Sequence, residues 1–318
     1  MALSPTSPSF SRRIILGAAI VIPVATAARS AGAQTLDADF LRVAVSTGVL
    51  ADIVAQVAGD RAIVSSVIPP GGDPHTWEAA AGDIAAIQEV NTFIWMGGFL
   101  ERFIESGAFR RAVQEAGIPE LKLADHMELI VRDVVIDHGD HVHDLREGDP
   151  HVWLDPLKAV EMIEVVRAHL TTLDPAGSAG YQERAAAYAS AVTTIHDESV
   201  AELAVLPAER RKLVVFHDAF SYFAARYEFA VVGVVIRNPS AEPSAGEIAE
   251  LIETIEREQV PAVFREPQFD AKILDVIADE TGVAIGELIT DAFADRVASY
   301  LDLLRFNIAS IVTNLGSA

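Results

Sequence analysis

The side chains best suited to chemistry are histidines and carboxylates in loops, most of them directly after short apolar segments. The members of this set that can bind a metal ion are His75, His151, His217, Glu266 and Asp291. Ligands of open α/β sheets bind beyond the carboxyl ends of the strands, so loops at that edge can bring these side chains to one cleft. Simpler interpretations stay open, because a lone loop histidine is usually a surface residue. Asp291 could cap the helix after it, and Glu266 could pair with a nearby arginine.

A repeated motif favours the metal interpretation for two of the histidines. The pattern Asp-Pro-His-x-Trp occurs at 73–77 and again at 149–153. Proline stiffens the approach to each histidine, and the tryptophan two residues later can pack against the imidazole. The chain contains no cysteine, so a metal site must use His, Asp, Glu or backbone oxygen, and disulfides and cysteine nucleophiles are excluded.

Short apolar segments alternate with helical patterns in both halves of the chain. The predicted strands are 41–46, 63–68, 92–96, 121–123, 213–216, 231–236, 262–264 and 283–285. The predicted helices between them include 50–58, 99–116, one capped by Ser244 and one capped by Asp270. This alternation indicates an α/β fold with parallel sheets that carry helices on both faces.

A long helix is expected between the halves. Residues 181–206 contain no Gly or Pro, and at 1.5 Å per residue they would span roughly 39 Å. Asp155 and Asp174 each precede a proline and read as helix N-caps. We therefore expect an N-terminal α/β lobe at 34–180, a stiff linking helix at 181–206 and a C-terminal α/β lobe at 207–318.

The first 33 residues have the features of a cleaved signal peptide. Arg12 and Arg13 precede a short apolar run, and Ala31-Gly32-Ala33 is a small-x-small cleavage pattern. The paired arginines are also compatible with twin-arginine export. We expect a periplasmic protein, and the missing cysteine predicts a mature chain without a lipid anchor.

Composition excludes some classes of partner. Of the 318 residues, 51% are hydrophobic and 22% are charged, which is typical of a folded globular protein. The chain has 24 basic and 46 acidic side chains, for a net charge of −22. Phosphate recognition needs a basic face, so the balance argues against nucleic acid as a partner.

Taken together and in order, the motifs resemble those of the metal-binding solute receptors of ATP-binding-cassette (ABC) importers, the cluster A-I family that takes up zinc and manganese. The matching segments are Asp73-Pro74-His75-Thr76-Trp77-Glu78, Asp149-Pro150-His151-Val152-Trp153, His217-Asp218-Ala219-Phe220-x-Tyr222-Phe223, Glu266-Pro267-Gln268-Phe269 and Asp291. The resemblance implies two α/β lobes joined by one long rigid helix, with the metal in the cleft between them. It implies His75, His151, His217 and Asp291 as ligands, and it places Glu266 near the site but not in the ligand set.

The resemblance also implies a function. The chain is expected to capture extracytoplasmic Zn²⁺, to deliver it to the membrane permease of an ABC importer, and not to be an enzyme. A zinc-donating periplasmic metallochaperone is a further candidate partner, and we expect a monomer. Asp73, Glu78 and Asp218 are the predicted carboxylates that orient the imidazoles.

Ligand chemistry favours zinc. Three imidazoles and one carboxylate suit tetrahedral Zn²⁺, whereas manganese prefers more oxygen. In the resembling family, manganese receptors tend to carry a glutamate where this chain has His217. A manganese receptor is nevertheless the alternative. A zinc hydrolase with Glu78 or Glu266 as general base is a weaker one, because four protein ligands leave no position for an activated water. An adhesin role, given to some family members, is compatible with the sequence.

The segment 137–144 is a second metal-capable feature. It holds His138, His141 and His143 among aspartates. One interpretation is a solvated acidic loop. The other is an auxiliary site that collects zinc weakly and feeds the main site.

Overall fold

The computed structural model describes residues 40–131, 135–137, 142–144, 148–237, 242–270, 272–293 and 296–316. Residues 38–318 form one compact unit, and the predicted signal peptide at 1–33 lies outside the described residues. The strands are β1 (Leu41–Val45), β2 (Ala62–Ser66), β3 (Thr92–Trp95), β4 (Glu120–Lys122), β5 (Val135–Asp137), β6 (Val142–Asp144), β7 (Lys212–His217), β8 (Ala230–Ile236), β9 (Ala262–Arg265) and β10 (Ala284–Glu287). The α-helices are α1 (Gly48–Ala58), α2 (Ala81–Ala86), α3 (Arg102–Glu105), α4 (Gly107–Ala116), α5 (Pro156–Leu173), α6 (Ser178–Leu203), α7 (Ser221–Tyr227), α8 (Ala245–Glu258), α9 (Lys272–Thr281) and α10 (Tyr300–Gly316).

The N-terminal sheet has the strand order β2-β1-β3-β4, with every neighbouring pair parallel. Successive side chains of β1 point to opposite faces. Val43 and Val45 join the core that contains the apolar face of α1, whereas Ala44 joins the core that contains α4. The chain passes from β1 into α1 at Thr47, whose hydroxyl accepts a hydrogen bond from the Leu50 amide as an N-cap. Helices thus cover both faces of the sheet, and loops occupy its carboxyl-terminal edge.

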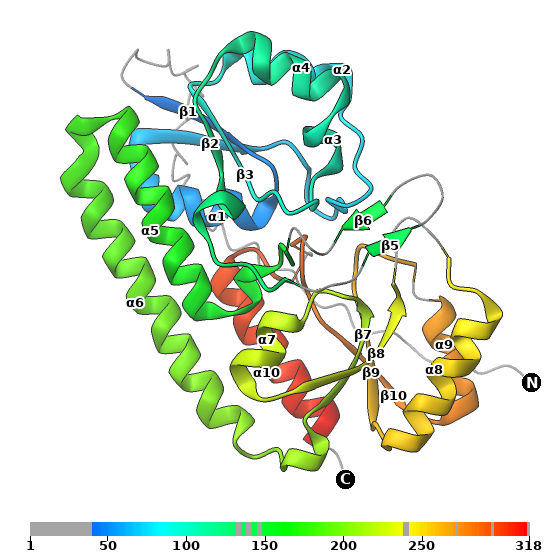
Figure 1. Ribbon diagram of the computed structural model, residues 1–318. Coiled ribbons are helices and arrows are strands. Elements are labelled where there is room, and N and C mark those ends of the chain that lie inside the picture. The colour runs from blue at the N-terminus through cyan, green and yellow to red at the C-terminus, as the bar shows by residue number, and fades with distance from the viewer. Residues whose placement is uncertain are drawn as a thin grey trace, which may run out of the picture. The chain divides into compact units, whose positions relative to one another are not determined.

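The C-terminal strands form two parallel pairs, β7 with β8 and β9 with β10, and β7 lies beside β9 (Figure 1). Val214 and Phe216 pack with α8 and α9, whereas Leu213 and Val215 pack into the core that includes α7 and α10. The predicted fold class, two α/β lobes with parallel sheets, is confirmed.

Helix α6 extends along both lobes (Figure 1) and has 26 residues, which corresponds to about 39 Å. Its buried residues recur every three or four positions and so form one stripe. They are Tyr181, Ala185, Tyr188, Val192, Ile195, Ser199 and Leu203. Arg184 donates to the carbonyls of Val57 and Ala58 at the end of α1, and the Tyr188 hydroxyl donates to Asp52. These bonds fix the first half of α6 against α1 of the N-terminal lobe.

Three local expectations need adjustment. The predicted helix at 99–116 begins later than expected, because Gly97, Gly98 and Phe99 all have positive φ. It is also broken into α3 and α4 at Gly107, which has φ 83°. The linking helix begins at Ser178 rather than Tyr181. The Asp174 side chain does not cap it but binds Arg61 and the Tyr181 hydroxyl.

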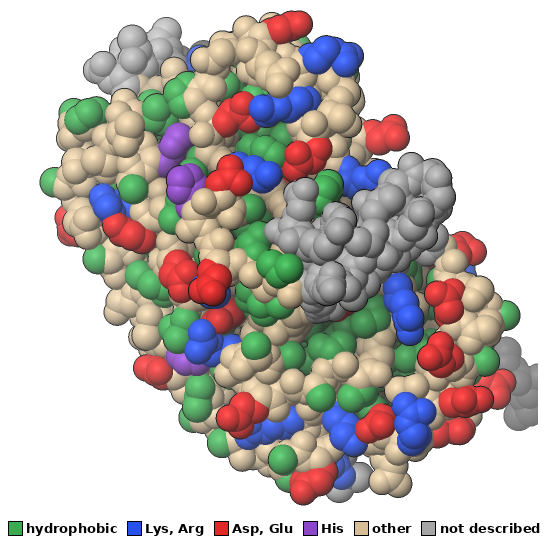
Figure 2. Space-filling view, in the orientation of Figure 1, with side chains coloured by type: hydrophobic (Ala, Val, Ile, Leu, Met, Phe, Trp, Pro, Cys, Tyr) green, Lys and Arg blue, Asp and Glu red, His purple; other side chains and the backbone are tan. Residues whose placement is uncertain are grey.

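Charged side chains are interspersed on the described surface. On the face drawn in Figure 2, acidic and basic side chains alternate over both lobes, and hydrophobic side chains gather between the lobes. Mixed signs keep the surface hydrated despite the acidic balance. The described helices include none long and apolar enough to cross a membrane.

Candidate metal centre

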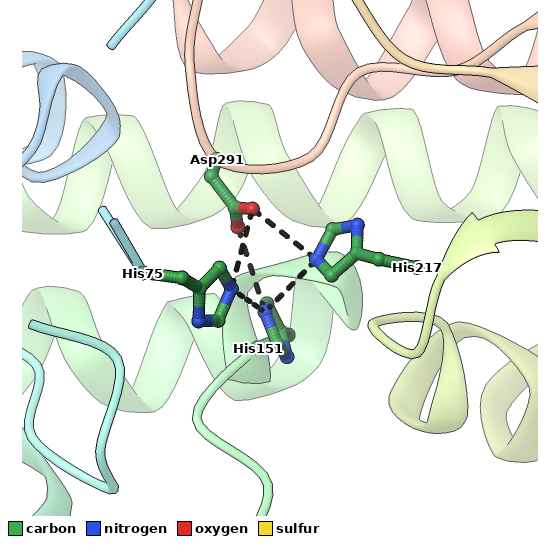
Figure 3. Close-up of side chains that lie close together, drawn as sticks. All are labelled: His75, His151, His217 and Asp291. Atoms are coloured by element: carbon green, nitrogen blue, oxygen red, sulfur yellow. Dashed lines mark hydrogen bonds and ion pairs between the residues drawn. The ribbon is translucent and has the colours of Figure 1, made fainter. Parts of the chain in front are cut away.

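Four of the five metal-capable side chains meet at one point (Figure 3). His217 is the last residue of β7, His75 lies in the loop after β2, and Asp291 lies four residues after β10. His151 precedes a short 3-10 turn that leads into α5. All four side chains are buried, and between 2% and 8% of each residue is exposed. Parallel strands end at the same edge of each sheet, so the segments of His75, His217 and Asp291 converge there. The turn before α5 brings His151 to the same point.

The separations of the ligand atoms are short and nearly equal. The Nε2 atom of His151 lies 3.3 Å from Nε2 of His75 and 3.4 Å from Nε2 of His217. Oδ2 of Asp291 lies 3.3 Å from Nε2 of His217 and 3.7 Å from Nε2 of His75, and its Oδ1 lies 3.6 Å from Nε2 of His151. All four residues offer a ligand atom within 4.8 Å of the others. The arrangement surrounds a space the size of one ion.

Two buried carboxylates orient two of the rings. Nδ1 of His151 lies 2.7 Å from Oδ1 of Asp149, and Nδ1 of His217 lies 2.7 Å from Oε1 of Glu266. An ionised carboxylate is only an acceptor, so each Nδ1 carries a proton, and Nε2 is the ring nitrogen that faces the centre and can bind a metal.

The electrostatics agree with a cation site. Burial acts to lower the pKa of His217, but the charges of Glu266 and Asp291 outweigh it and raise that pKa well above its usual value. Burial acts to raise the pKa of Asp291, yet the surrounding imidazoles hold it well below the usual range. Oδ1 of Asp291 accepts no hydrogen bond from any residue that the structure describes. A buried carboxylate oxygen without a donor fits a metal ligand.

The carboxylates that orient the rings of His151 and His217 are not the predicted Asp73 and Glu78. Glu78 is exposed, and Asp73 accepts from the backbone amide of His75 rather than from its ring. Sequence reasoning missed Asp149 in this role and left Glu266 without one. A signal for Asp149 existed, because it stands two residues before His151 in the repeated motif.

The auxiliary loop stays a prediction. His138 and His141 lie outside the described residues. His143 is in β6, which pairs antiparallel with β5, and only its backbone is described.

Comparison with known proteins decides the family. The family model for ZnuA, described as the periplasmic component A of a zinc-uptake complex, matches residues 43–314, nearly the whole described chain. The chain belongs to this family. As a member of the ZnuA family it is a metal-binding, extracytoplasmic receptor of an ABC metal importer, and it is not an enzyme.

Relatives of this ZnuA-family receptor carry names for different metals. The manganese-binding lipoprotein MntA of Halalkalibacterium halodurans is 25% identical over 93% of this chain and 97% of its own length. The iron-binding protein YfeA of Yersinia pestis is 27% identical over 92% of each chain. The zinc-binding lipoprotein AdcA of Streptococcus pneumoniae is 27% identical over 82% of this chain but only 53% of its own length. The names of MntA and AdcA describe both proteins as lipoproteins. These names conflict with the expectation that the mature form of this chain has no lipid anchor.

Solved structures agree on the fold. The periplasmic zinc-binding protein TroA from Treponema pallidum superposes with a TM-score of 0.75 and 26% identity, covering 87% of this chain and 99% of its own. A manganese-bound periplasmic metal-binding protein from Candidatus Liberibacter asiaticus gives a TM-score of 0.74 at 22% identity, over 86% of this chain and 99% of its own.

Proposed function

We propose that His75, His151, His217 and Asp291 bind one Zn²⁺ ion, which the protein delivers to the permease of an ABC importer. The main observation that supports this proposal is the convergence of three imidazole Nε2 atoms and one carboxylate in a buried space. Oδ1 of Asp291 accepts no hydrogen bond from the residues that the structure describes. A divalent cation supplies the missing partner.

The spacing supports zinc over manganese. A tetrahedral ion with bonds of about 2.0–2.1 Å places its ligand atoms roughly 3.3–3.4 Å apart. The recorded separations from 3.3 to 3.7 Å are close to that value. Manganese favours six oxygen-rich positions, and this buried site offers three nitrogens and one carboxylate.

The remaining parts of the proposal follow from this role. We propose that the lobes extend over 34–180 and 207–318, that the receptor acts as a monomer in the periplasm, and that a metallochaperone can supply its zinc. A hydrolytic role has no support from the site, because four protein ligands complete a tetrahedral zinc.

Chelator competition on the purified mature protein tests the site. We expect one tight zinc equivalent in the wild type. His75→Ala, His151→Ala and His217→Ala should each weaken binding by orders of magnitude. His196→Ala is the matched control, because His196 lies on α6 and contacts only the Tyr227 hydroxyl among its recorded ring hydrogen bonds. Retained wild-type affinity in all three site variants contradicts the assignment, and tighter binding of Mn²⁺ than of Zn²⁺ contradicts the choice of metal.

A further inference from the structure

Thr290 occupies a central place behind the metal centre. It is fully buried and directly precedes Asp291 in the chain. Its hydroxyl contacts the carboxylate that orients His217, and its carbonyl is held by a side chain that packs on His151. Thr290 therefore contacts the side chains that support His217 and His151, and it is covalently bonded to Asp291.

The hydroxyl of Thr290 completes the hydrogen bonding of Glu266. Oε1 of Glu266 accepts from the backbone amide and ring of His217, and Oε2 accepts from the Thr290 hydroxyl and from Nε2 of Gln268. Gln268 also donates to the Thr290 oxygen at 3.0 Å. The Thr290 hydroxyl has one proton, which it gives to Glu266, and it approaches Oδ2 of Asp291 at 3.3 Å. With both oxygens bound, the Glu266 carboxylate is fixed, and so is the ring of His217.

The carbonyl of Thr290 ties the same residue to the segment of His151. Nε1 of Trp153 donates to this carbonyl at 3.0 Å, and the indole meets the His151 ring edge-on with centroids 5.5 Å apart. The backbone oxygen of Trp153 accepts from the Tyr300 hydroxyl at the start of α10. The indole therefore holds the peptide that carries Asp291 at a set distance from His151.

We propose that Thr290 is a positioning residue that keeps His151, His217 and Asp291 at tetrahedral spacing, and that it thereby sets the preference for zinc over larger, more highly coordinated ions. The inference rests on the proposed function, since it concerns the selectivity of the same site. A rigid set of ligands favours the ion whose geometry it matches, and loosening it reduces that advantage.

The test compares Thr290→Val, which removes the hydroxyl at similar volume, with Thr290→Ser, which keeps it. Thr92→Val is the matched control. Thr92 is also fully buried and donates to a carbonyl, that of Pro119, but it lies on β3 in the other sheet. Zinc and manganese affinities are measured by chelator competition. The visible absorption of bound Co²⁺ reports the coordination geometry, because tetrahedral Co²⁺ absorbs strongly and five- or six-coordinate Co²⁺ weakly.

We expect Thr290→Val to lower zinc affinity about 10- to 100-fold, as removal of groups behind metal ligands typically does. Manganese affinity should fall less, so the zinc-to-manganese ratio drops, and the Co²⁺ bands should weaken. Thr290→Ser and Thr92→Val should keep the wild-type ratio and spectrum. If Thr290→Val does not fold, Trp153→Phe tests the same proposal, because it keeps an aromatic ring beside His151 and removes the bond to the Thr290 carbonyl. It too should lower the ratio.

An unchanged ratio and Co²⁺ spectrum in Thr290→Val overturns the proposal, even if the variant is less stable. Equal effects of Thr290→Val and Thr290→Ser also overturn it, because the serine keeps the hydroxyl. These outcomes differ from a failure of the proposed function, in which the wild-type protein itself binds no zinc.

Discussion

Each oriented imidazole at the centre depends on a buried carboxylate behind it. Asp149 accepts hydrogen bonds at Oδ1 from both the backbone amide and the ring of His151. This carboxylate fixes a proton on Nδ1 and the orientation of the ring, so that Nε2 faces the metal centre.

Replacing Asp149 therefore tests this arrangement. Asp149→Leu should weaken zinc binding about 10- to 100-fold, because the ring loses its orienting partner. Asp149→Asn should cost less, since the amide oxygen still accepts from Nδ1 while the charge is gone. Chelator competition gives both values. Wild-type affinity in Asp149→Leu, with the protein folded, would show that the ring needs no support from this carboxylate.

Glu101 is a second buried carboxylate, but it has a different consequence. It accepts hydrogen bonds from the Ser46 hydroxyl and from the amides of Met96 and Gly97, and these are its recorded partners on the surrounding elements. Burial raises its pKa to about 7, although the three hydrogen bonds act in the opposite direction. A folded-state pKa above the unfolded value means that stability is greatest at low pH and is lost as the pH rises through 7.

The raised pKa of Glu101 makes the free energy of unfolding depend on pH. Between pH 5 and pH 8 the wild type should lose about 2–3 kcal/mol of unfolding free energy relative to Glu101→Gln, which cannot ionise. Urea denaturation at the two pH values measures the difference between the two proteins. Parallel pH profiles would mean that Glu101 ionises in the folded state as easily as in the unfolded chain.

For single residues, the sequence predicts the metal ligands better than the residues that orient them. His75 and His217 follow predicted strands, so their placement follows from the topology, and His151 stands in the same Asp-Pro-His-x-Trp motif as His75. Glu266 and His217 are 49 residues apart, and Thr290 is 24 residues from Glu266. Contacts of that kind depend on side-chain packing between β7, β9 and the loop after β10, which periodicity does not describe.

Helix caps differ in how much tertiary structure they support. Asp155 accepts from the Leu157 amide at the start of α5 and also forms two hydrogen bonds with Arg226 of α7. Ser244 caps α8 through a reciprocal box with Glu247 at the surface. The first cap links elements of the two halves, whereas the second acts only on its own helix.

The pair of caps gives a matched comparison. Ser244→Ala should cost about 1 kcal/mol, the usual value for an N-cap. Asp155→Ala should cost about 2–4 kcal/mol, because it also leaves a partly buried arginine without its partner. Chemical denaturation of each variant provides the two values. Equal losses would show that the Asp155–Arg226 pair contributes nothing beyond capping.

The elements predicted well are those with a strong local cause. The caps at Thr47, Asp155 and Ser244 and the stops at Gly117 and Gly282 fix helix ends through hydrogen bonds or a left-handed residue. The helix predicted at 99–116 was wrong in its first turns. Its apolar residues fit a helical period, but the chain takes three left-handed residues in a row at 97–99, a conformation held by tertiary contacts such as the packing of Gly98 against Pro150.

Across the whole molecule, one continuous core connects the lobes. It includes Val45 of β1, Val166 of α5, Val192 of α6, Val215 of β7 and Ile308 of α10. A shared core favours cooperative unfolding, because neither lobe can expose its inner face without disturbing the other.

This connection makes zinc a stabiliser of the entire fold. The four ligands belong to segments that are far apart in the sequence and meet only in the folded chain, so the unfolded chain lacks the site. At free zinc about 1,000 times the dissociation constant, the gain in unfolding free energy is roughly 4 kcal/mol. For a protein of this size that corresponds to a rise in Tm on the order of 10 °C.

Differential scanning calorimetry with and without zinc measures this shift, and His217→Ala serves as the control with a disabled site. We expect one transition that moves as a whole in the wild type and stays in place in the variant. An unmoved wild-type transition would contradict zinc binding to the folded state. An equal shift in the variant would place the bound zinc at other residues. Two transitions, of which zinc moves only one, would show that the core between the lobes does not couple their unfolding.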